Sequence, residues 1–171
     1  MRHISVLPQV SILCSKRSDG DFRGKHTVVD DLPGYARNSR CFTHLHLEHG
    51  VVVALPSEKE STVEADAAGV FHDKQGLGVG VGDCFPIFLG DHEAKVLAMI
   101  HGGWRSLATG IVQQTLNVMQ LHGALAPRLR VWIGPGARSC CYRSALEPTQ
   151  MNEHDWHSVI DKVEKIEQEK N

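Results

Sequence analysis

Apolar and polar positions along the first part of the chain predict short strands joined by turns. Residues 1–40 alternate short apolar stretches with turn formers, so short strands and loops are expected there. Residues 42–55 alternate and then become β-branched, which predicts a strand, a turn at Gly50 and a second strand. The segment 56–69 is mostly polar and is expected to lie exposed on the surface.

The pattern in the second half is clearer. Residues 77–82 and 85–90 are predicted as short strands, and the continuous apolar run 94–100 is typical of a buried strand. Residues 105–123 predict one helix that Gly123 would terminate, followed by a strand over 129–134. The residues expected on one face of this helix are Leu107, Ile111, Thr115, Leu116 and Met119.

Alternating strands and helices in a chain of this length predict a single mixed α/β domain over 1–171. Residues 151–170 complete it as an amphipathic helix. A net charge of −2 without a basic tract argues against nucleic acid as a partner, and no apolar run is long enough to cross a membrane. The first ten residues lack the apolar core of a secretory signal, so a cytoplasmic location is expected, with reduced cysteines.

The hexapeptide HGGWRS at 101–106 carries the strongest chemical signal. His101 ends a predicted buried strand, and Gly102 and Gly103 lead into the predicted helix, whose first backbone N–H groups favour an anion. Arg105 would reinforce this preference, because its planar guanidinium suits phosphate or carboxylate.

Cys84 stands at a break between two predicted strands and could share a pocket with His101 if those strands are neighbours. Two chemistries fit the pair: a thiolate nucleophile assisted by the histidine, or a zinc site in which both side chains are ligands. A zinc site of the catalytic kind needs a third ligand, and the residues alone leave three candidates open: His44, His46 and His49.

Four segments in this order resemble the YfiH-like family, whose members have been called laccase-domain or polyphenol oxidase proteins and purine nucleoside phosphorylases. The segments are ADAAG at 65–69, VGDCFPIFL at 81–89, HGGWRSLATGI at 101–111 and IGPGARSCCY at 133–142. The resemblance also matches LEHG at 47–50 to a shorter family motif, which selects His49 as the third ligand. Ser106 departs from the pattern, in which a glycine is usual.

The resemblance implies a four-layer α/β/β/α fold, with mixed sheets packed face to face between helices and apparently shortened at the C-terminus. It implies zinc held by His49, Cys84 and His101, and phosphorolysis of adenosine, inosine, guanosine and methylthioadenosine with adenosine deamination as a side activity. Arg105 would lie near the phosphate, and Asp83 is the nearest candidate for a proton donor at the substrate. The implied partners are a purine nucleoside and phosphate.

Three other hypotheses remain. The chain could be a cysteine hydrolase or deamidase with Cys84 as nucleophile and His101 as base. It could also be a shortened, catalytically silent relative that binds a nucleotide. A copper oxidase ranks lower, because the sequence has too few clustered histidines for a multicopper array.

Overall fold

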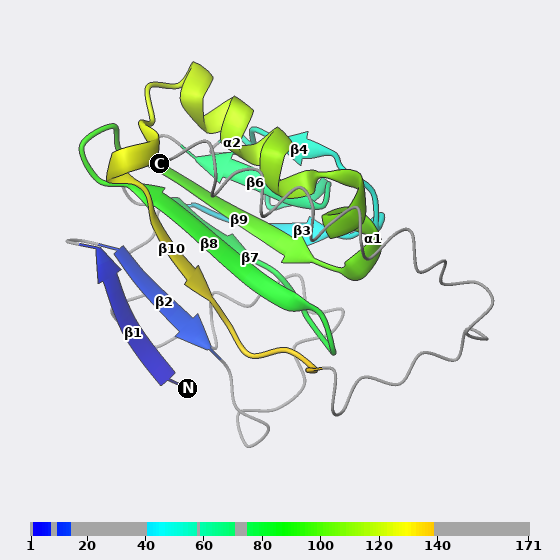
Figure 1. The fold of residues 1–171 in the computed structure, drawn as a ribbon. Helices are drawn as coiled ribbons and strands as arrows, with labels where there is room; N and C mark the ends of the chain where they lie inside the picture. Colours follow the sequence, from blue (N-terminus) through cyan, green and yellow to red (C-terminus); the bar gives the residue numbers. More distant parts are fainter. Residues whose placement is uncertain (1, 8–9, 15–40, 58, 71–74, 139–171) are drawn as a thin grey trace, which may run out of the picture.

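The computed structural model describes residues 2–7, 10–14, 41–57, 59–70 and 75–138 (Figure 1). Its strands and helices follow in chain order: β1 Arg2–Leu7, β2 Val10–Cys14, β3 Cys41–His46, β4 Val53–Ala54, β5 Thr62–Glu64, β6 Ala67–Val70, β7 Gln75–Gly78, β8 Phe85–Asp91, β9 Val96–Gly102, α1 Trp104–Thr109, α2 Ile111–Leu121, the 3-10 turn Ala126–Arg128 and β10 Arg130–Ile133. The predicted helix at 151–170 lies outside the described residues.

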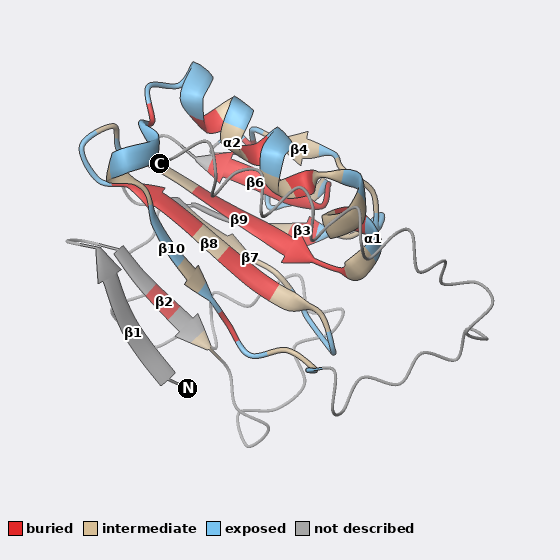
Figure 2. Cartoon of the chain, viewed as in Figure 1, coloured by how far each residue is buried: buried red, intermediate tan, exposed pale blue. Residues whose placement is uncertain are grey.

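The larger sheet has five strands in the order β10-β8-β9-β6-β4. At its centre, β8 and β9 form an antiparallel pair that runs from Phe85 opposite Gly102 to Asp91 opposite Val96. Figure 2 shows that β8, β9 and β6 are largely buried, which suits their continuous apolar sequences. The strands predicted at 85–90, 94–100 and 129–134 are therefore confirmed, with ends shifted by one or two residues.

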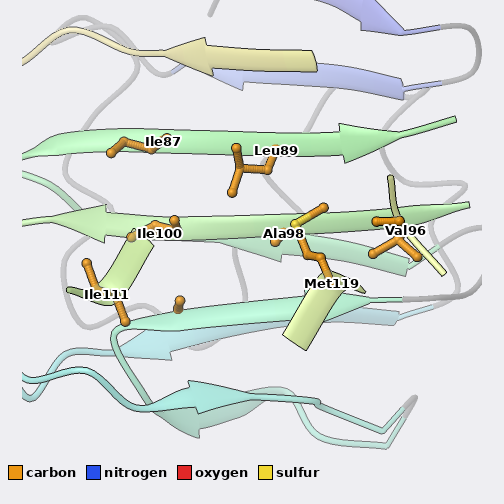
Figure 3. Packing of buried hydrophobic residues seen from close by; sticks show 9 residues of the cluster. Ile87, Leu89, Val96, Ala98, Ile100, Ile111 and Met119 are labelled. Atoms are coloured by element: carbon orange, nitrogen blue, oxygen red, sulfur yellow. The ribbon is translucent and has the colours of Figure 1, made fainter. Parts of the chain in front are cut away.

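Helix α2 covers one face of this sheet (Figure 1). Ile111 and Met119 are fully buried and belong to one cluster with residues of β6, β8 and β9, part of which Figure 3 shows in a close view. The predicted apolar face of the helix is thus the face that packs, and its burial supplies much of the core. The cluster consists of Ala67, Ile87, Leu89, Val96, Ala98, Ile100, Ile111, Met119 and Ala124.

The prediction of one continuous helix over 105–123 was wrong. The chain forms α1 and α2, and between them Gly110 has a φ of 95°, in the left-handed region that ends a helix. Because a glycine within a helical pattern is often tolerated, the spacing alone did not reveal the break. The break lets α1 remain at the end of β9 while α2 turns back over the sheet (Figure 1).

The other face of the larger sheet packs on a second sheet, in which β3 pairs with β5 and β7 in parallel. Leu45 of β3 lies in a buried cluster with Ala68 of β6 and Met99 of β9, so the two sheets meet face to face. The mixed α/β class with face-to-face sheets is confirmed. The second helical layer of the expected fold does not occur within the described residues.

Two further expectations need correction. The segment 56–69 was expected to be exposed, but Ala65 to Gly69 are buried, and the last three of them belong to β6, which pairs with β9. Long-range pairing decides this burial, whereas the polar character of the segment comes mainly from residues 57–64, of which 57 and 59–64 are described and largely exposed. The strand expected at 77–82 is β7, which begins at Gln75 and ends at Gly78.

The predicted turn at Gly50 exists and has a particular role. It joins β3 of the smaller sheet to β4 of the larger one, so the chain crosses between the two sheets at His49 and Gly50. His49 has a φ of 59°, which is uncommon for a residue with a side chain. This crossing brings His49 to the end of the larger sheet. Within the described residues, no helix is long and apolar enough to span a membrane.

Candidate active site

Cys84 and His101 meet around Gly103, where β9 ends and α1 begins. A Cβ atom added to Gly103 would lie 3.1 Å from Cε1 of His101 and 3.5 Å from Sγ of Cys84. The register explains this, because Phe85 is opposite Gly102 and Cys84 is therefore next to Gly103. The two strands that carry Cys84 and His101 are neighbours, as the sequence-based hypothesis required. Glycine at 103 leaves room for both side chains.

His49 lies beside His101. Their ring centroids are 5.2 Å apart, and the ring planes are inclined at 56°. His101 is buried, whereas His49 is exposed on the turn between the sheets. Of the other two candidates, His46 is exposed on β3, and His44 lies in the same strand with Nε2 4.0 Å from a Cβ added to Gly80. The structure therefore places His49, the residue that the family motif selects, next to His101.

Burial lowers the pKa of His101, and the electrostatic effect of the neighbouring His49 lowers it further, while the carboxyl group of Asp66 opposes both effects. The imidazole of His101 is consequently neutral near neutral pH. A neutral imidazole retains a lone pair, which a metal ligand or a general base requires. Its Nδ1 atom is buried and has no hydrogen-bond partner among the described residues.

Cys84 is half-buried and has a free thiol. Burial raises the pKa of this thiol, and the negative charge of Asp83 raises it further. His101 beside it is neutral and therefore does not lower the pKa of the thiol. The thiol therefore stays protonated near neutral pH unless a cation binds to it.

The other residues that the sequence singled out are Arg105, Asp83 and Ser106. Arg105 is exposed in α1, with its guanidinium carbon 4.8 Å from the centre of the Trp104 ring. Asp83 is exposed, and its backbone carbonyl accepts a hydrogen bond of 2.8 Å from Ala137 N. Ser106, which replaces a family glycine, is buried in α1, and its hydroxyl oxygen has no partner in the described part of the chain.

The chemistry of the three donors fits zinc, since two imidazoles and one thiolate are ligands that it commonly takes. Because Nδ1 of buried His101 has no hydrogen-bond partner among the described residues, the ring is not committed to another structural role there. Within residues 2–7, 10–14, 41–57, 59–70 and 75–138, however, no group of three or more His, Cys, Asp or Glu side chains is arranged to hold a metal ion. Side chains would have to rotate for His49, Cys84 and His101 to bind one ion together.

Sequence reasoning missed Asp66, which lies against this site. It is fully buried just before β6, and neither carboxyl oxygen has a hydrogen-bond partner among the described residues. Its backbone carbonyl accepts a hydrogen bond of 2.8 Å from the N–H of His101. One signal could have revealed it: Asp66 is the only polar residue of ADAAG at 65–69, and a carboxyl group within an apolar run indicates burial.

Comparisons with known proteins identify a family and several relatives to which this chain is similar. The family model described as "Multi-copper polyphenol oxidoreductase laccase" matches residues 29–169. A purine nucleoside phosphorylase of Clostridium acetobutylicum is 34% identical over 98 residues, which cover 57% of this chain and 41% of that protein. The purine nucleoside phosphorylase of Deinococcus radiodurans is 34% identical over 95 residues, covering 56% of this chain and 37% of that protein.

Adenosine deaminase RL5, from an unknown prokaryotic organism, is 33% identical over 66 residues, which cover 39% of this chain and 25% of that protein. Two solved structures share the fold. YlmD from Geobacillus stearothermophilus has a TM-score of 0.59 at 23% identity, covering 72% of this chain and 52% of that one. The hypothetical protein YfiH of Bacillus licheniformis has a TM-score of 0.60 at 17% identity, covering 77% and 52%. The chain thus spans about half or less of the length of these relatives.

Proposed function

The chain belongs to the multi-copper polyphenol oxidoreductase laccase family, and we propose that it is a zinc-dependent purine nucleoside phosphorylase. Its substrates would be adenosine, inosine, guanosine and methylthioadenosine, with adenosine deamination as a side activity. Two relatives named purine nucleoside phosphorylase and one named adenosine deaminase support this proposal. The cytoplasm, where thiols remain reduced, is the location that suits a free Cys84.

The observation that carries the proposal is the meeting of His49, Cys84 and His101 at the end of β9. The three residues come from distant parts of the chain, and His101 lies beside each of the other two. In the proposal these three side chains hold the zinc ion, which supplies Lewis acidity and can activate a water molecule for deamination. The neutral imidazole of His101 suits this role, because a ligand must offer a lone pair.

The remaining residues would bind and orient the substrates. In phosphorolysis, an oxygen atom of phosphate forms a bond to C1′ of the ribose while the bond from C1′ to N9 of the purine breaks. The products are ribose 1-phosphate and the free base, and the base gains a proton. Arg105 is proposed to hold the phosphate in line with C1′, because its exposed guanidinium is free to reach an anion beside α1. Asp83, next to Cys84, is the candidate donor of the proton, which its carboxylate would first have to take up from solvent.

The alternative with Cys84 as nucleophile makes a different demand on the thiol. A nucleophilic cysteine needs a lowered pKa, usually from an adjacent histidinium or a helix N-terminus. Here burial and Asp83 raise the pKa of Cys84, and the adjacent His101 is neutral. These directions favour a thiol that becomes a thiolate only when a metal cation binds.

The metal is tested first. Protein purified without added metal should contain close to one zinc per chain by inductively coupled plasma spectrometry, and Cys84→Ala and His101→Ala should each lose it. Cys14→Ala is the matched control, because Cys14 is also a half-buried cysteine but lies in β2. Iodoacetamide gives a second reading: Cys84 should be protected until a chelator is added. Rapid alkylation of metal-free Cys84 with turnover retained would support the hydrolase instead.

The reaction is tested by incubating the protein with inosine and with adenosine, each with and without phosphate. Free hypoxanthine and adenine should form only with phosphate, and inosine should accumulate slowly from adenosine. Cys84→Ala should abolish the formation of hypoxanthine, adenine and inosine, and Cys14→Ala should not. If zinc binds stoichiometrically and nucleosides bind by calorimetry without any product, the chain is the silent relative and the proposed activity is wrong.

A further inference from the structure

Three of the four buried side-chain atoms without a hydrogen-bond partner in the described part of the chain belong to one pair of residues. They are both carboxyl oxygens of Asp66 and Nδ1 of His101. Asp66 is 0% exposed and His101 is 2% exposed, so neither group has solvent in place of a partner. Buried polar groups of this kind cost free energy, and one that persists requires an explanation.

The sheet register makes the two residues direct neighbours. In the antiparallel pair of β6 and β9, Ala67 is opposite Ile100 and Ala68 is opposite Met99. One step further, His101 N donates to the carbonyl of Asp66, so these two residues continue the ladder. Directly opposed residues of an antiparallel pair have Cβ atoms about 5 Å apart, on the same face of the sheet.

That face is the one that carries the candidate site. Side chains alternate along a strand, so Asp66 and His101 share the face of Ala68 and Met99, which packs against the smaller sheet. The turn that bears His49 lies over the same place, since a Cβ added to Gly50 would be 3.4 Å from Oδ2 of Asp66. Cys84 just before β8, His101 in β9 and Asp66 just before β6 therefore lie on one face, at the same end of the sheet.

We propose that Asp66 is a positioning residue for His101: its carboxyl group accepts a hydrogen bond from the Nδ1–H of His101. Both groups branch from the atom next to Cβ, so a change of side-chain rotamer can close the gap between two opposed residues. The bond places the ring proton on Nδ1 and leaves Nε2 as the nitrogen with the lone pair. A carboxylate behind a ligating histidine commonly fixes the ring in this way.

This inference rests on the proposed function, because it assigns His101 the role of a lone-pair donor. The geometry supports it, since Asp66 and His101 are opposed across the two strands and both have buried side-chain atoms without a partner in the described part of the chain. A carboxyl group that favours protonation of one ring nitrogen strengthens the other as a ligand. A direct metal-ligand role for Asp66 is the competing assignment, and the experiment below separates the two.

The first measurement is the tautomer of His101 in metal-free protein, read from the nitrogen chemical shifts of its imidazole at about pH 8. The signal is assigned by its loss in His101→Gln. Wild type should show the proton on Nδ1. Asp66→Ala should shift the ring toward the Nε2–H tautomer, and Asp66→Asn, which keeps one acceptor oxygen, should fall between them. Asp91→Asn changes another fully buried aspartate of the same sheet and should leave the signal unchanged.

The second measurement is zinc affinity, by competition with a chelator. Asp66→Ala should weaken binding by about 10- to 100-fold, and Asp66→Asn should weaken it less. A wild-type ring with its proton on Nε2, or a tautomer that ignores both Asp66 substitutions, would overturn the inference. Loss of zinc in Asp66→Asn with an unchanged tautomer would overturn it in favour of direct ligation. If the tautomer responds but wild type binds no zinc and cleaves no nucleoside, the positioning role stands and the proposed function fails.

Discussion

Two aspartates at opposite ends of the larger sheet are equally buried and differ in every contact. Asp91 ends β8 and Asp66 precedes β6, and both are 0% exposed. The carboxyl group of Asp91 accepts four hydrogen bonds, of 2.9–3.0 Å, from the backbone N–H groups of Glu93, Ala94 and Leu125 and from Nε of Arg128. That of Asp66 accepts none from the described residues.

The contacts of Asp91 explain why it is buried. Its Oδ1 holds the turn between β8 and β9, and its Oδ2 ties that turn to the segment after α2, with Arg128 as counter-ion at 2.9 Å. Burial by itself raises the pKa of Asp91, but the hydrogen bonds from Ala94 and Leu125 and the charge of Arg128 outweigh it and lower the pKa to about 2. Asp91 is therefore a structural residue, and the ionised form is the one that the fold stabilises.

No such account exists for Asp66. Since a buried carboxyl group without partners costs folding free energy, its place beside His101 and beneath the turn of His49 is better explained by function. The difference teaches that burial alone does not identify the role of a charged residue. Its hydrogen-bond partners and counter-ions identify that role, and a buried charged residue that lacks them is a candidate for the active site.

Removing the carboxylate of Asp91 should have the largest effect on stability. Asp91→Ala leaves three backbone N–H groups and the guanidinium of Arg128 without their acceptor, so the free energy of unfolding should fall by about 3 kcal/mol. Asp66→Ala should change it by less than about 1 kcal/mol, although the residue is equally buried. Urea denaturation followed by circular dichroism measures both. Equal losses in the two variants would remove the distinction between them.

Lowering the pH should remove the contribution of Asp91 to the free energy of unfolding within a defined pH range. The folded pKa of Asp91 is about 2, below the ordinary value of 3.8, so its ionised form stabilises the fold above about pH 4. This contribution is lost as the pH falls from about 4 towards 2, because the folded protein must then take up the proton. Asp91→Asn lacks the titrating group, so its stability deficit relative to wild type should shrink across this range. A deficit that is constant from pH 6 to about pH 2.5 would contradict the assignment.

The same contrast limits what the sequence could predict. The β8 and β9 strands and the packing face of α2 were predicted because local apolar patterns specify them. The sequence left open whether Cys84 and His101 are neighbours, and the antiparallel pairing of β8 with β9 brings them together. The choice of His49 came from the family motif, because the spacing of the residues had left His44 and His46 equally open.

The burial of Asp66 could not be predicted from the neighbouring sequence, and the reason is physical. It follows a polar, exposed stretch, and its burial depends on the pairing of β6 with β9, which lies more than thirty residues further along the chain. The break at Gly110 was missed for a similar reason, because the direction of α2 is set by packing on the sheet. Long-range pairing was thus the information that the sequence pattern lacked.

Gly102 and Gly103 allow a second comparison, between a glycine that the strand pairing requires and a glycine that lies beside the candidate site. A Cβ on Gly102 would lie 2.6 Å from the backbone oxygen of Phe85, which cannot move without disturbing the β8–β9 pair. Gly102→Ala should therefore lower the free energy of unfolding by about 2 kcal/mol. Gly103→Ala meets only the side chains of His101 and Cys84, at 3.1 and 3.5 Å, and should lower it by less than about 1 kcal/mol while reducing zinc binding. The reverse order of stability would show that Gly103 is the structural position.

The smallest effect is expected at the outer edge of the Asp91 cluster. Arg128 also donates from Nη1 to Glu93 at 3.0 Å, but the Glu93 side chain is 70% exposed. Solvent and salt screen such a pair, so Glu93→Gln should lower the free energy of unfolding by at most about 0.5 kcal/mol, and by less in high salt. Urea denaturation at low and high ionic strength tests this. A loss as large as that of Asp91→Ala would mean that Glu93, rather than the buried carboxylate, holds Arg128 in place.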